Sequence, residues 1–403
     1  MPPTQLDRRL GLADAVFLGL GSMIGAGVFA AFAPAARAAG AGLLIALVLA
    51  AVVAYCNATS SARLAAIHPE SGGTYVYGRE RLGEFWGYLA GWGFVTGKTA
   101  SCAAMALTVV AYAAPGLGQP WRSLLAVAVV AALTAVNYFG VHRSALATRV
   151  IVSCTLLVLL VSGAAMAAGP SGGGPLVAWP GGGGVLEAAG LLFFAFAGYA
   201  RLATLGEEVR DPARTIPRAI PLALGITLVV YAAVAVLLLV RLGPAALAAS
   251  PDPIAAAVPG WLAPVVRAGA AIAALGSLLA LILGVSRTTL AMSRDGHLPR
   301  FLAAVHPRHR VPHRAELAVG LVVAVLAATI DLRAAIGFSS FAVLTYYAIA
   351  NAAALTLKGK VRAALGLAGC VVLAFSLPLP SVLAGGTALL LGVLAYGVRR
   401  IRR

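Results

Sequence analysis

The feature of this chain that most restricts its fold is a series of apolar stretches that recurs from one end to the other. A helix of about 20 apolar residues crosses the hydrocarbon core of a bilayer, where only helices and closed barrels satisfy their backbone groups. The repeated stretches therefore predict an all-α membrane protein. We expect twelve transmembrane helices, at residues 12–36, 40–62, 83–112, 122–140, 146–168, 185–206, 217–242, 262–291, 315–331, 334–357, 363–377 and 382–398.

Composition agrees with this prediction. Hydrophobic residues make up 61% of the chain and charged residues 11%, against about 45–50% and about 25% in soluble domains. These values exclude a disordered chain, a soluble enzyme and a disulfide-stapled secreted domain. The four cysteines lie inside apolar stretches without metal-ligand spacing, so we expect no metal site and no cofactor.

Basic residues are distributed unevenly along the chain. The formal net charge is +17, and 22 of the 30 Lys and Arg residues fall on alternate connections or on the termini. Cytoplasmic loops of membrane proteins carry such an excess, so both termini are expected in the cytoplasm, in a bacterial inner membrane. In a soluble protein the charge would suggest nucleic acid, but here it indicates contact with anionic membrane lipids and no nucleic-acid partner.

Two of the stretches contain candidate interruptions at mid-depth. Residues 19–27 hold four glycines in nine positions, and residues 193–199 read FFAFAGY. These stretches begin two halves of five helices each, and because five is odd the halves would have opposite orientations. Interrupted helices at matching places in inverted repeats point to the binding site of a transporter. The alternative is that the glycines only allow close helix packing.

The chemistry of the two interruptions is complementary. Unwinding at residues 25–27 would expose amide groups where a helix restarts, which favours a carboxylate. Unwinding at residues 194–198 would expose carbonyls where a helix ends, which favours an ammonium group. A site with both preferences suits an amino acid.

Four segments match a known family in their order and in their predicted topology. They are residues 21–29 (GSMIGAGVF), 71–77 (SGGTYVY), 207–218 (EEVRDPARTIPR) and 293–299 (SRDGHLP). Over nearly its whole length, the chain resembles the amino acid–polyamine–organocation (APC) family of permeases. The resemblance implies a single transmembrane permease domain with a LeuT-type 5+5 inverted repeat. The halves would be residues 10–168 and 185–357, with broken helices 1 and 6 and two appended helices at 362–398.

The resemblance also implies which residues bind the substrate. The amides near Met23, Ile24, Gly25, Ala26 and Gly27 would hold the substrate carboxylate. The carbonyls of Phe194, Ala195 and Ala197 would meet its amino group, with Phe196 or Tyr199 as an aromatic gate.

Three basic residues fall inside expected spans: Lys98, Arg201 and Arg287. An ionisable group inside a membrane is expensive and usually functional. Many proton-coupled members of the family are similar in having a lysine in helix 5, but the matching position here is Thr155. We hypothesise that Lys98 takes that role by exchanging a proton; alternatively, it snorkels or binds a helix-end carbonyl. For Arg201 and Arg287, reaching the cytoplasmic interface is the favoured interpretation.

The expected function is secondary active transport of an amino acid by alternating access, coupled to protons or working by exchange. No Asp or Glu is expected at mid-depth, which favours a neutral substrate. The alternative within the same fold is a transporter of a cationic amino acid or a polyamine. Outside transport, an intramembrane enzyme would need a cluster of His, Asp or Cys in the membrane, which the sequence does not offer, and an ion channel is a further alternative.

Overall fold

A computed structural model describes residues 10–68, 72–139, 145–171, 182–199, 202 and 209–401. Within these ranges the chain is helical, and its one β-type pairing is an isolated bridge between Leu10 and Val209. The all-α expectation is therefore confirmed for the described residues. The helices of the first half are α1 (Leu12–Met23), α2 (Gly27–Ala30), α3 (Phe32–Ala39), η1 (Gly40–Gly42), α4 (Leu43–Ile67), α5 (Thr74–Leu82), α6 (Glu84–Ala113), α7 (Trp121–Tyr138) and α8 (Ala145–Ala167).

The second half continues the same pattern of long apolar helices joined by short connections. Its elements are α9 (Gly182–Phe196), η2 (Ala197–Tyr199), α11 (Pro212–Ala249), α12 (Pro253–Ala257), α13 (Ala263–Arg294), η3 (Arg300–Ala303), α14 (His313–Thr329), α15 (Leu332–Ala354), α16 (Val361–Phe375) and α17 (Leu379–Ile401). Nine segments of the described chain are long and apolar enough to cross a membrane. Helices α9, α14 and α16 are shorter, at 15, 17 and 15 residues.

The boundaries differ from expectation where glycine changes the backbone. The stretch expected at 217–242 belongs to a 38-residue helix, α11, which continues to Ala249 across a kink. The kink lies at Gly243, one residue after the expected end, where the φ of 69° is readily adopted only by glycine. Helix α5 was not among the expected spans; it is a nine-residue helix that packs against α6.

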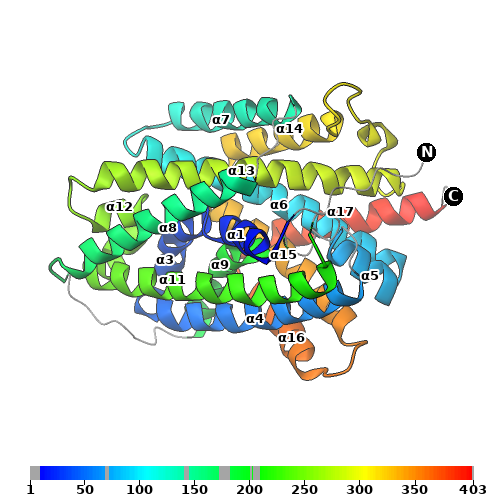
Figure 1. Cartoon of the computed structure of the whole chain (residues 1–403), viewed down its shortest axis with the longest axis horizontal. Coiled ribbons are helices and arrows are strands. Elements are labelled where there is room, and N and C mark those ends of the chain that lie inside the picture. Colours follow the sequence, from blue (N-terminus) through cyan, green and yellow to red (C-terminus); the bar gives the residue numbers. More distant parts are fainter. Residues whose placement is uncertain are drawn as a thin grey trace.

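The long helices run side by side, with α1 and α9 in the middle of the bundle (Figure 1). Helix α6 is the most enclosed: 89% of the residues in its apolar stretch are buried, against 17% in α17. Helices α13, α15 and α5 pack around α6. Helix α6 is therefore a central element, whereas α17 lies at the periphery.

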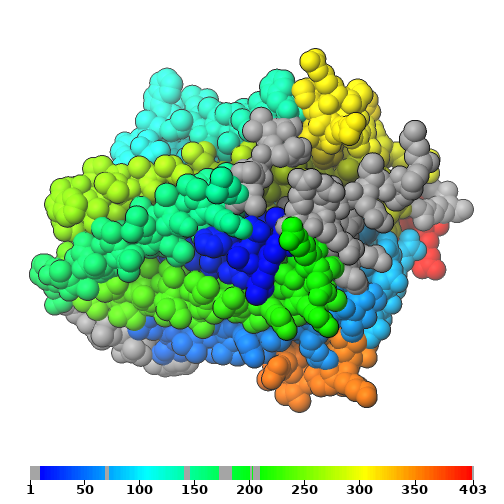
Figure 2. Space-filling view, viewed as in Figure 1, coloured from blue at the N-terminus to red at the C-terminus, as the bar shows by residue number. Residues whose placement is uncertain are grey.

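The outer faces of the bundle are apolar. Leu160 on α8, Val229 on α11 and Leu321 on α14 are 70%, 70% and 67% exposed. In Figure 2, α8 and α11 lie across the middle of the face shown, and part of the chain's first helix reaches the surface between them. Large exposed apolar surfaces are rare on soluble monomers, so these faces are suited to contact lipid.

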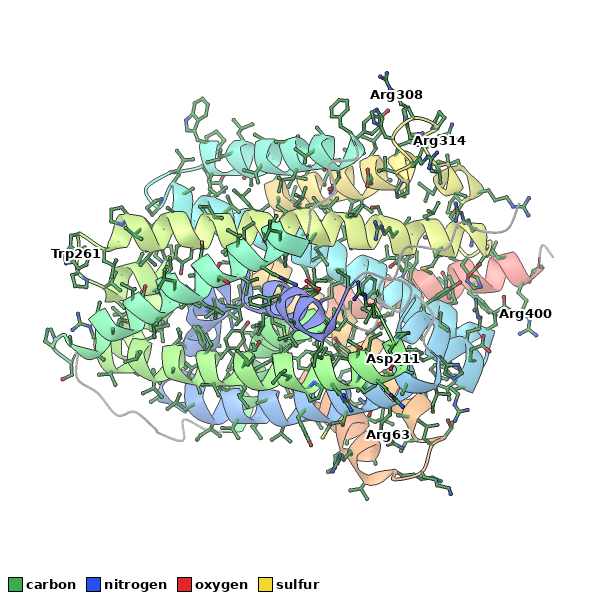
Figure 3. The ribbon with its side chains drawn as sticks, in the orientation of Figure 1. Arg63, Asp211, Trp261, Arg308, Arg314 and Arg400 are labelled. Atoms are coloured by element: carbon green, nitrogen blue, oxygen red, sulfur yellow. The ribbon has the colours of Figure 1, made fainter. Side chains whose placement is uncertain are left out.

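Charged side chains gather toward one end of the bundle. Arg63, Arg308, Arg314 and Arg400 all lie toward the right in Figure 3, whereas Trp261 lies at the opposite end. The uneven distribution of basic residues expected from the sequence is thus visible as a difference between the two ends of the bundle. It agrees with the two sides of a membrane carrying different charge.

Candidate substrate site

The first span is interrupted in the middle of the bundle. Helix α1 ends at Met23, and α2 begins at Gly27. Ile24 still donates its amide to the Leu20 carbonyl at 2.7 Å. Among the described residues, the amides of Gly25, Ala26 and Gly27 make no hydrogen bond. The interruption therefore leaves three neighbouring donors at the residues expected to hold a carboxylate.

The glycines at the interruptions also allow very close packing. A Cβ on Gly25 would lie 1.7 Å from Ser277 Oγ on α13, and one on Gly27 would lie 2.9 Å from the Ala195 Cα. A Cβ on Gly198 would lie 2.3 Å from the Ser22 carbonyl oxygen. The glycines therefore allow close helix packing, because the backbones of the two interruptions meet where a side chain would not fit.

The sixth stretch changes its geometry at the expected place. Helix α9 ends at Phe196 and continues as the 3₁₀ turn η2 over residues 197–199. The α-helical geometry therefore gives way to a 3₁₀ turn among the residues expected to present carbonyls. Residues 200, 201 and 203–208 lie outside the described residues, and so does the expected charge at Arg201.

Lys98 lies at this second interruption. Its side chain, 6% exposed on α6, donates from Nζ to the Ala197 carbonyl at 3.0 Å. The Tyr347 hydroxyl on α15 donates to the same oxygen at 3.2 Å. Lys98 therefore does not snorkel to the interface but binds a helix-end carbonyl, which was the other alternative expected for it. The same carbonyl was expected to meet the substrate amino group.

Tyr231 on α11 joins the two interruptions. Its hydroxyl lies 2.5 Å from the Met23 carbonyl oxygen and 3.1 Å from that of Ala195. On the other side, Ser277 donates to the Gly21 carbonyl at 2.8 Å. Four helices outside the interruptions (α6, α11, α13 and α15) thus supply hydroxyl or amine donors to carbonyls at or beside them.

Sequence reasoning missed Tyr231, Ser277 and Tyr347. Each is a polar residue inside an otherwise apolar stretch, which was the available signal. Nothing in the sequence indicated that their hydroxyl groups converge on two particular segments.

Aromatic rings surround the second interruption. Phe196 is fully buried, with its ring centroid 5.1 Å from that of Tyr231. Tyr199 is also fully buried, with its ring centroid 4.8 Å from that of Tyr347 and the ring planes tilted by 31°. Phe194, 7% exposed, lies two residues before Phe196. Both expected gate residues are therefore enclosed at the junction with α11 and α15.

The structure does not bring Thr155 into this group. Its hydroxyl donates to the Ile151 carbonyl of its own helix, α8, at 2.8 Å. Position 155 is buried, but its hydrogen-bonding capacity is used locally. Of the two expected coupling residues, only Lys98 hydrogen-bonds to an interruption within the described chain.

A second buried polar cluster continues from Tyr347 between α4, α15 and α16. The Asn351 side chain donates to Asn57 Oδ1 at 2.6 Å and to the Tyr347 carbonyl at 2.9 Å. Cys370 lies 3.3 Å from the same Asn57 oxygen. This cluster fixes α15, whose Tyr347 reaches the second interruption.

Glu316 is a buried acidic residue near the end of a span. It lies in the first turn of α14, near a span end as expected. Its side chain is nevertheless fully buried. Neither carboxylate oxygen has a hydrogen-bond partner among the described residues. The charge of Arg287 on α13 attracts it. Arg287 therefore interacts with a buried acid in the second half of α13.

Comparison with known proteins shows which family the chain belongs to. The model of the family described as "Amino acid permease" matches residues 10–395. The chain belongs to the amino acid permease family. It is therefore a multi-pass membrane protein, and the family assignment identifies it as a transporter rather than an enzyme. The resemblance seen in the four sequence segments is confirmed.

Individual relatives agree with that assignment. An uncharacterized transporter of Mycobacterium tuberculosis (strain ATCC 25618 / H37Rv) is 67% identical over 99% of this chain and 93% of its own length. The branched-chain amino acid permease BcaP of Bacillus subtilis (strain 168) is 28% identical, over 88% of this chain and 82% of its own. A vacuolar cationic amino acid transporter 4 of Arabidopsis thaliana is 31% identical, over 82% of this chain and 60% of its own.

Among the described residues of this permease, no three His, Cys, Asp or Glu side chains are grouped so that they could hold a metal ion. Side-chain donors from four helices, by contrast, surround the two interruptions. The polar chemistry that the structure shows at the centre of the permease is hydrogen bonding between side chains and backbone carbonyls.

Proposed function

We propose that this permease carries a neutral amino acid across the cytoplasmic membrane by alternating access. The observation that carries the proposal is the meeting of two interrupted helices. One presents the amides of Gly25, Ala26 and Gly27, which have no partner among the described residues, and the other presents the carbonyls of Ala195 and Ala197. Amides favour a carboxylate and carbonyls an ammonium, so the two ends of an amino acid would find opposite partners.

The proposed architecture is the LeuT-type inverted repeat with twelve spans. Residues 10–168 and 185–357 would form the two halves, with both termini in the cytoplasm. Support comes from the interruptions at the start of each half and from the separation of charge along the bundle. The interruptions would remain fixed around the substrate while the surrounding helices rock.

The substrate preference is argued from Lys98. Two unit charges 4 Å apart repel by about 4 kcal/mol at an effective dielectric constant of 20. A second positive charge on a substrate side chain would meet that repulsion, and no acidic residue of the described chain pairs with Lys98 to offset it. A neutral side chain is therefore favoured, although cationic substrates are the alternative because one relative is named a cationic amino acid transporter.

Coupling to protons would follow from the same contact. A substrate ammonium at the Ala197 carbonyl would compete with the Lys98 ammonium for one oxygen. Releasing a proton from Lys98 removes the repulsion and frees the carbonyl. Substrate binding and proton release from Lys98 would thus be linked, as a proton-exchanging group requires.

The test is a thermal-shift screen of the full-length purified permease against the twenty amino acids, followed by uptake into proteoliposomes. A ligand that binds the folded state raises the unfolding temperature. We expect neutral amino acids to stabilise the protein and to compete for saturable uptake. Stabilisation by arginine and lysine alone would support the cationic alternative, and non-saturating flux would indicate a channel.

A further inference from the structure

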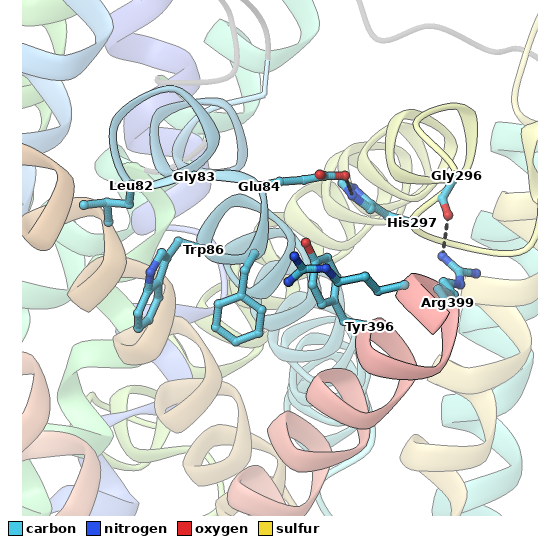
Figure 4. A pocket seen from close by; sticks show the side chains of 10 residues that line it. Leu82, Gly83, Glu84, Trp86, Gly296, His297, Tyr396 and Arg399 are labelled. Atoms are coloured by element: carbon cyan, nitrogen blue, oxygen red, sulfur yellow. Dashed lines mark hydrogen bonds and ion pairs between the residues drawn. The ribbon is translucent and has the colours of Figure 1, made fainter. Parts of the chain in front are cut away.

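A cavity of about 470 Å³ lies away from the interruptions, where the first turn of α6 meets the last turns of α17. Figure 4 shows its walls, which combine apolar, aromatic and basic side chains. The lining residues are Leu82, Gly83, Glu84, Phe85, Trp86, Gly296, His297, Tyr396, Arg399 and Arg400. Nothing in the proposed transport cycle uses this cavity.

The basic side chains of the cavity come from the end of α17. Arg399 donates to the Gly296 carbonyl at 2.6 Å, which holds its guanidinium against the loop after α13. The contact uses one of five N–H donors, so most of the guanidinium fork is left for another acceptor. Arg400 is exposed and makes no hydrogen bond or ion pair with the described residues.

The acidic groups near the cavity already have partners. Glu84 Oε1 lies 3.3 Å from His297 Nε2. Asp295 accepts a hydrogen bond from the Tyr75 hydroxyl at 2.5 Å and lies 3.4 Å from an Arg79 nitrogen. The cavity is therefore lined by the two α17 arginines and by the Glu84 carboxylate, so the formal charge of these three side chains is +1.

The apolar side of the cavity continues into the membrane-facing surface. Trp86 is 44% exposed, and the Phe85 ring lies 5.4 Å from that of Tyr396. Further along α17, Leu394 and Val398 are 56% and 51% exposed. Aromatic residues of this kind gather at the level of lipid headgroups, and exposed aliphatic residues next to them suit acyl chains.

Hydrogen bonds hold together the two helices that form the cavity walls, α6 and α17. The Tyr88 hydroxyl donates to the Gly392 carbonyl at 2.9 Å, and the Trp92 indole donates to the Ala388 carbonyl at 2.7 Å. These bonds join α6 to α17 along two turns directly below the cavity. The arginines therefore stand at a defined position over the start of α6.

We propose that this cavity binds the phosphate of an anionic membrane lipid. The Arg399 and Arg400 guanidinium groups would bind the phosphate oxygens, for which planar paired donors are well suited. The first-turn amides of Phe85 and Trp86, at the start of a 30-residue helix, add favourable partial charge. The acyl chains would lie along the exposed face of α17.

The experiment is a titration of the detergent-purified full-length permease with phosphatidylglycerol, followed by native mass spectrometry. Phosphatidylcholine and soluble glycerol 3-phosphate are titrated in parallel. Wild-type protein should bind phosphatidylglycerol in a saturable manner, in preference to phosphatidylcholine. Removing arginines by R400Q and by R399Q/R400Q should weaken binding about fivefold for each arginine, the contribution usual for a basic residue at an anionic membrane surface.

The matched control is R308Q/R310Q, which removes two arginines from the loop before α14. It should leave phosphatidylglycerol binding unchanged. R400Q keeps the Arg399–Gly296 contact, so its effect is separable from any misfolding of the double variant. Equal binding by wild type and R400Q, or equal binding of phosphatidylcholine, would overturn the proposal. Displacement of the lipid by glycerol 3-phosphate would overturn it too, by assigning the site to a soluble phosphate.

Discussion

At the scale of single residues, Lys98 is the clearest departure from an apolar interior. Its amine reaches the Ala197 carbonyl from a position that is 6% exposed. If Lys98 exchanges a proton during transport, Lys98→Met should abolish the pH dependence of uptake and reduce its rate. The measurement is initial uptake into proteoliposomes over a range of external pH, with the exposed Lys360→Met as control. Unchanged pH dependence in Lys98→Met would rule out the coupling role.

Tyr231 gives a second test at this scale. Tyr231→Phe removes a hydroxyl that serves carbonyls of both interruptions. Leaving a buried acceptor unpaired costs about 1–3 kcal/mol. The unfolding temperature of the Tyr231→Phe variant should therefore fall, and its affinity for the amino acid should weaken. Tyr112→Phe is the control, because the Tyr112 hydroxyl donates to the Phe29 carbonyl in α2 at 3.1 Å and to neither interruption. That variant should lose stability while keeping substrate affinity, and an equal loss of affinity in both would contradict the assigned role.

At the scale of helices, the close approach of α1 to its neighbours depends on residues without side chains. Gly25→Ala would place a Cβ 1.7 Å from Ser277 Oγ. Overpacking of this kind costs about 1–3 kcal/mol, so we expect a lower unfolding temperature and little uptake. Adding Ser277→Ala should recover part of the loss, since the nearest remaining atom would be the Ser277 Cβ at 2.7 Å.

The control for this prediction is Gly225→Ala on α11. A Cβ there would have no neighbour within 4 Å among the described residues. Alanine in a helix interior is favoured over glycine by about 1 kcal/mol, so the control should be as stable as wild type or more so. If Gly25→Ala were equally stable, the two interruptions would not meet as closely as described.

At the scale of the whole molecule, the separation of charge predicts sidedness. Trp261 is 75% exposed at the end opposite Arg308. In a Cys154→Ser background, which removes the exposed native cysteine, Trp261→Cys should react with a membrane-impermeant maleimide in intact cells. Arg308→Cys should react only after the membrane is opened. The reverse pattern would place the basic end outside and overturn the predicted orientation.

The sequence by itself determined the class of the protein and much of its outline. Apolar stretches of about 20 residues leave few alternatives to membrane helices, so nearly every expected span falls on a helix. The interruptions at residues 24–26 and 197–199 could also be located, because glycines inside an apolar stretch are local features of the chain. The motifs were sufficient to recognise the permease family.

Only the tertiary structure decided which side chains serve the interruptions. Tyr231, Ser277 and Tyr347 come from three different helices, and their hydroxyl groups converge on carbonyls at or beside the interruptions. The burial of Glu316 and the cavity between α6 and α17 were likewise decided only by the tertiary structure. Hydrophobic patterns and local motifs determine where a single helix lies in the sequence. The hydrogen-bond partners of a polar atom depend instead on how separate helices pack.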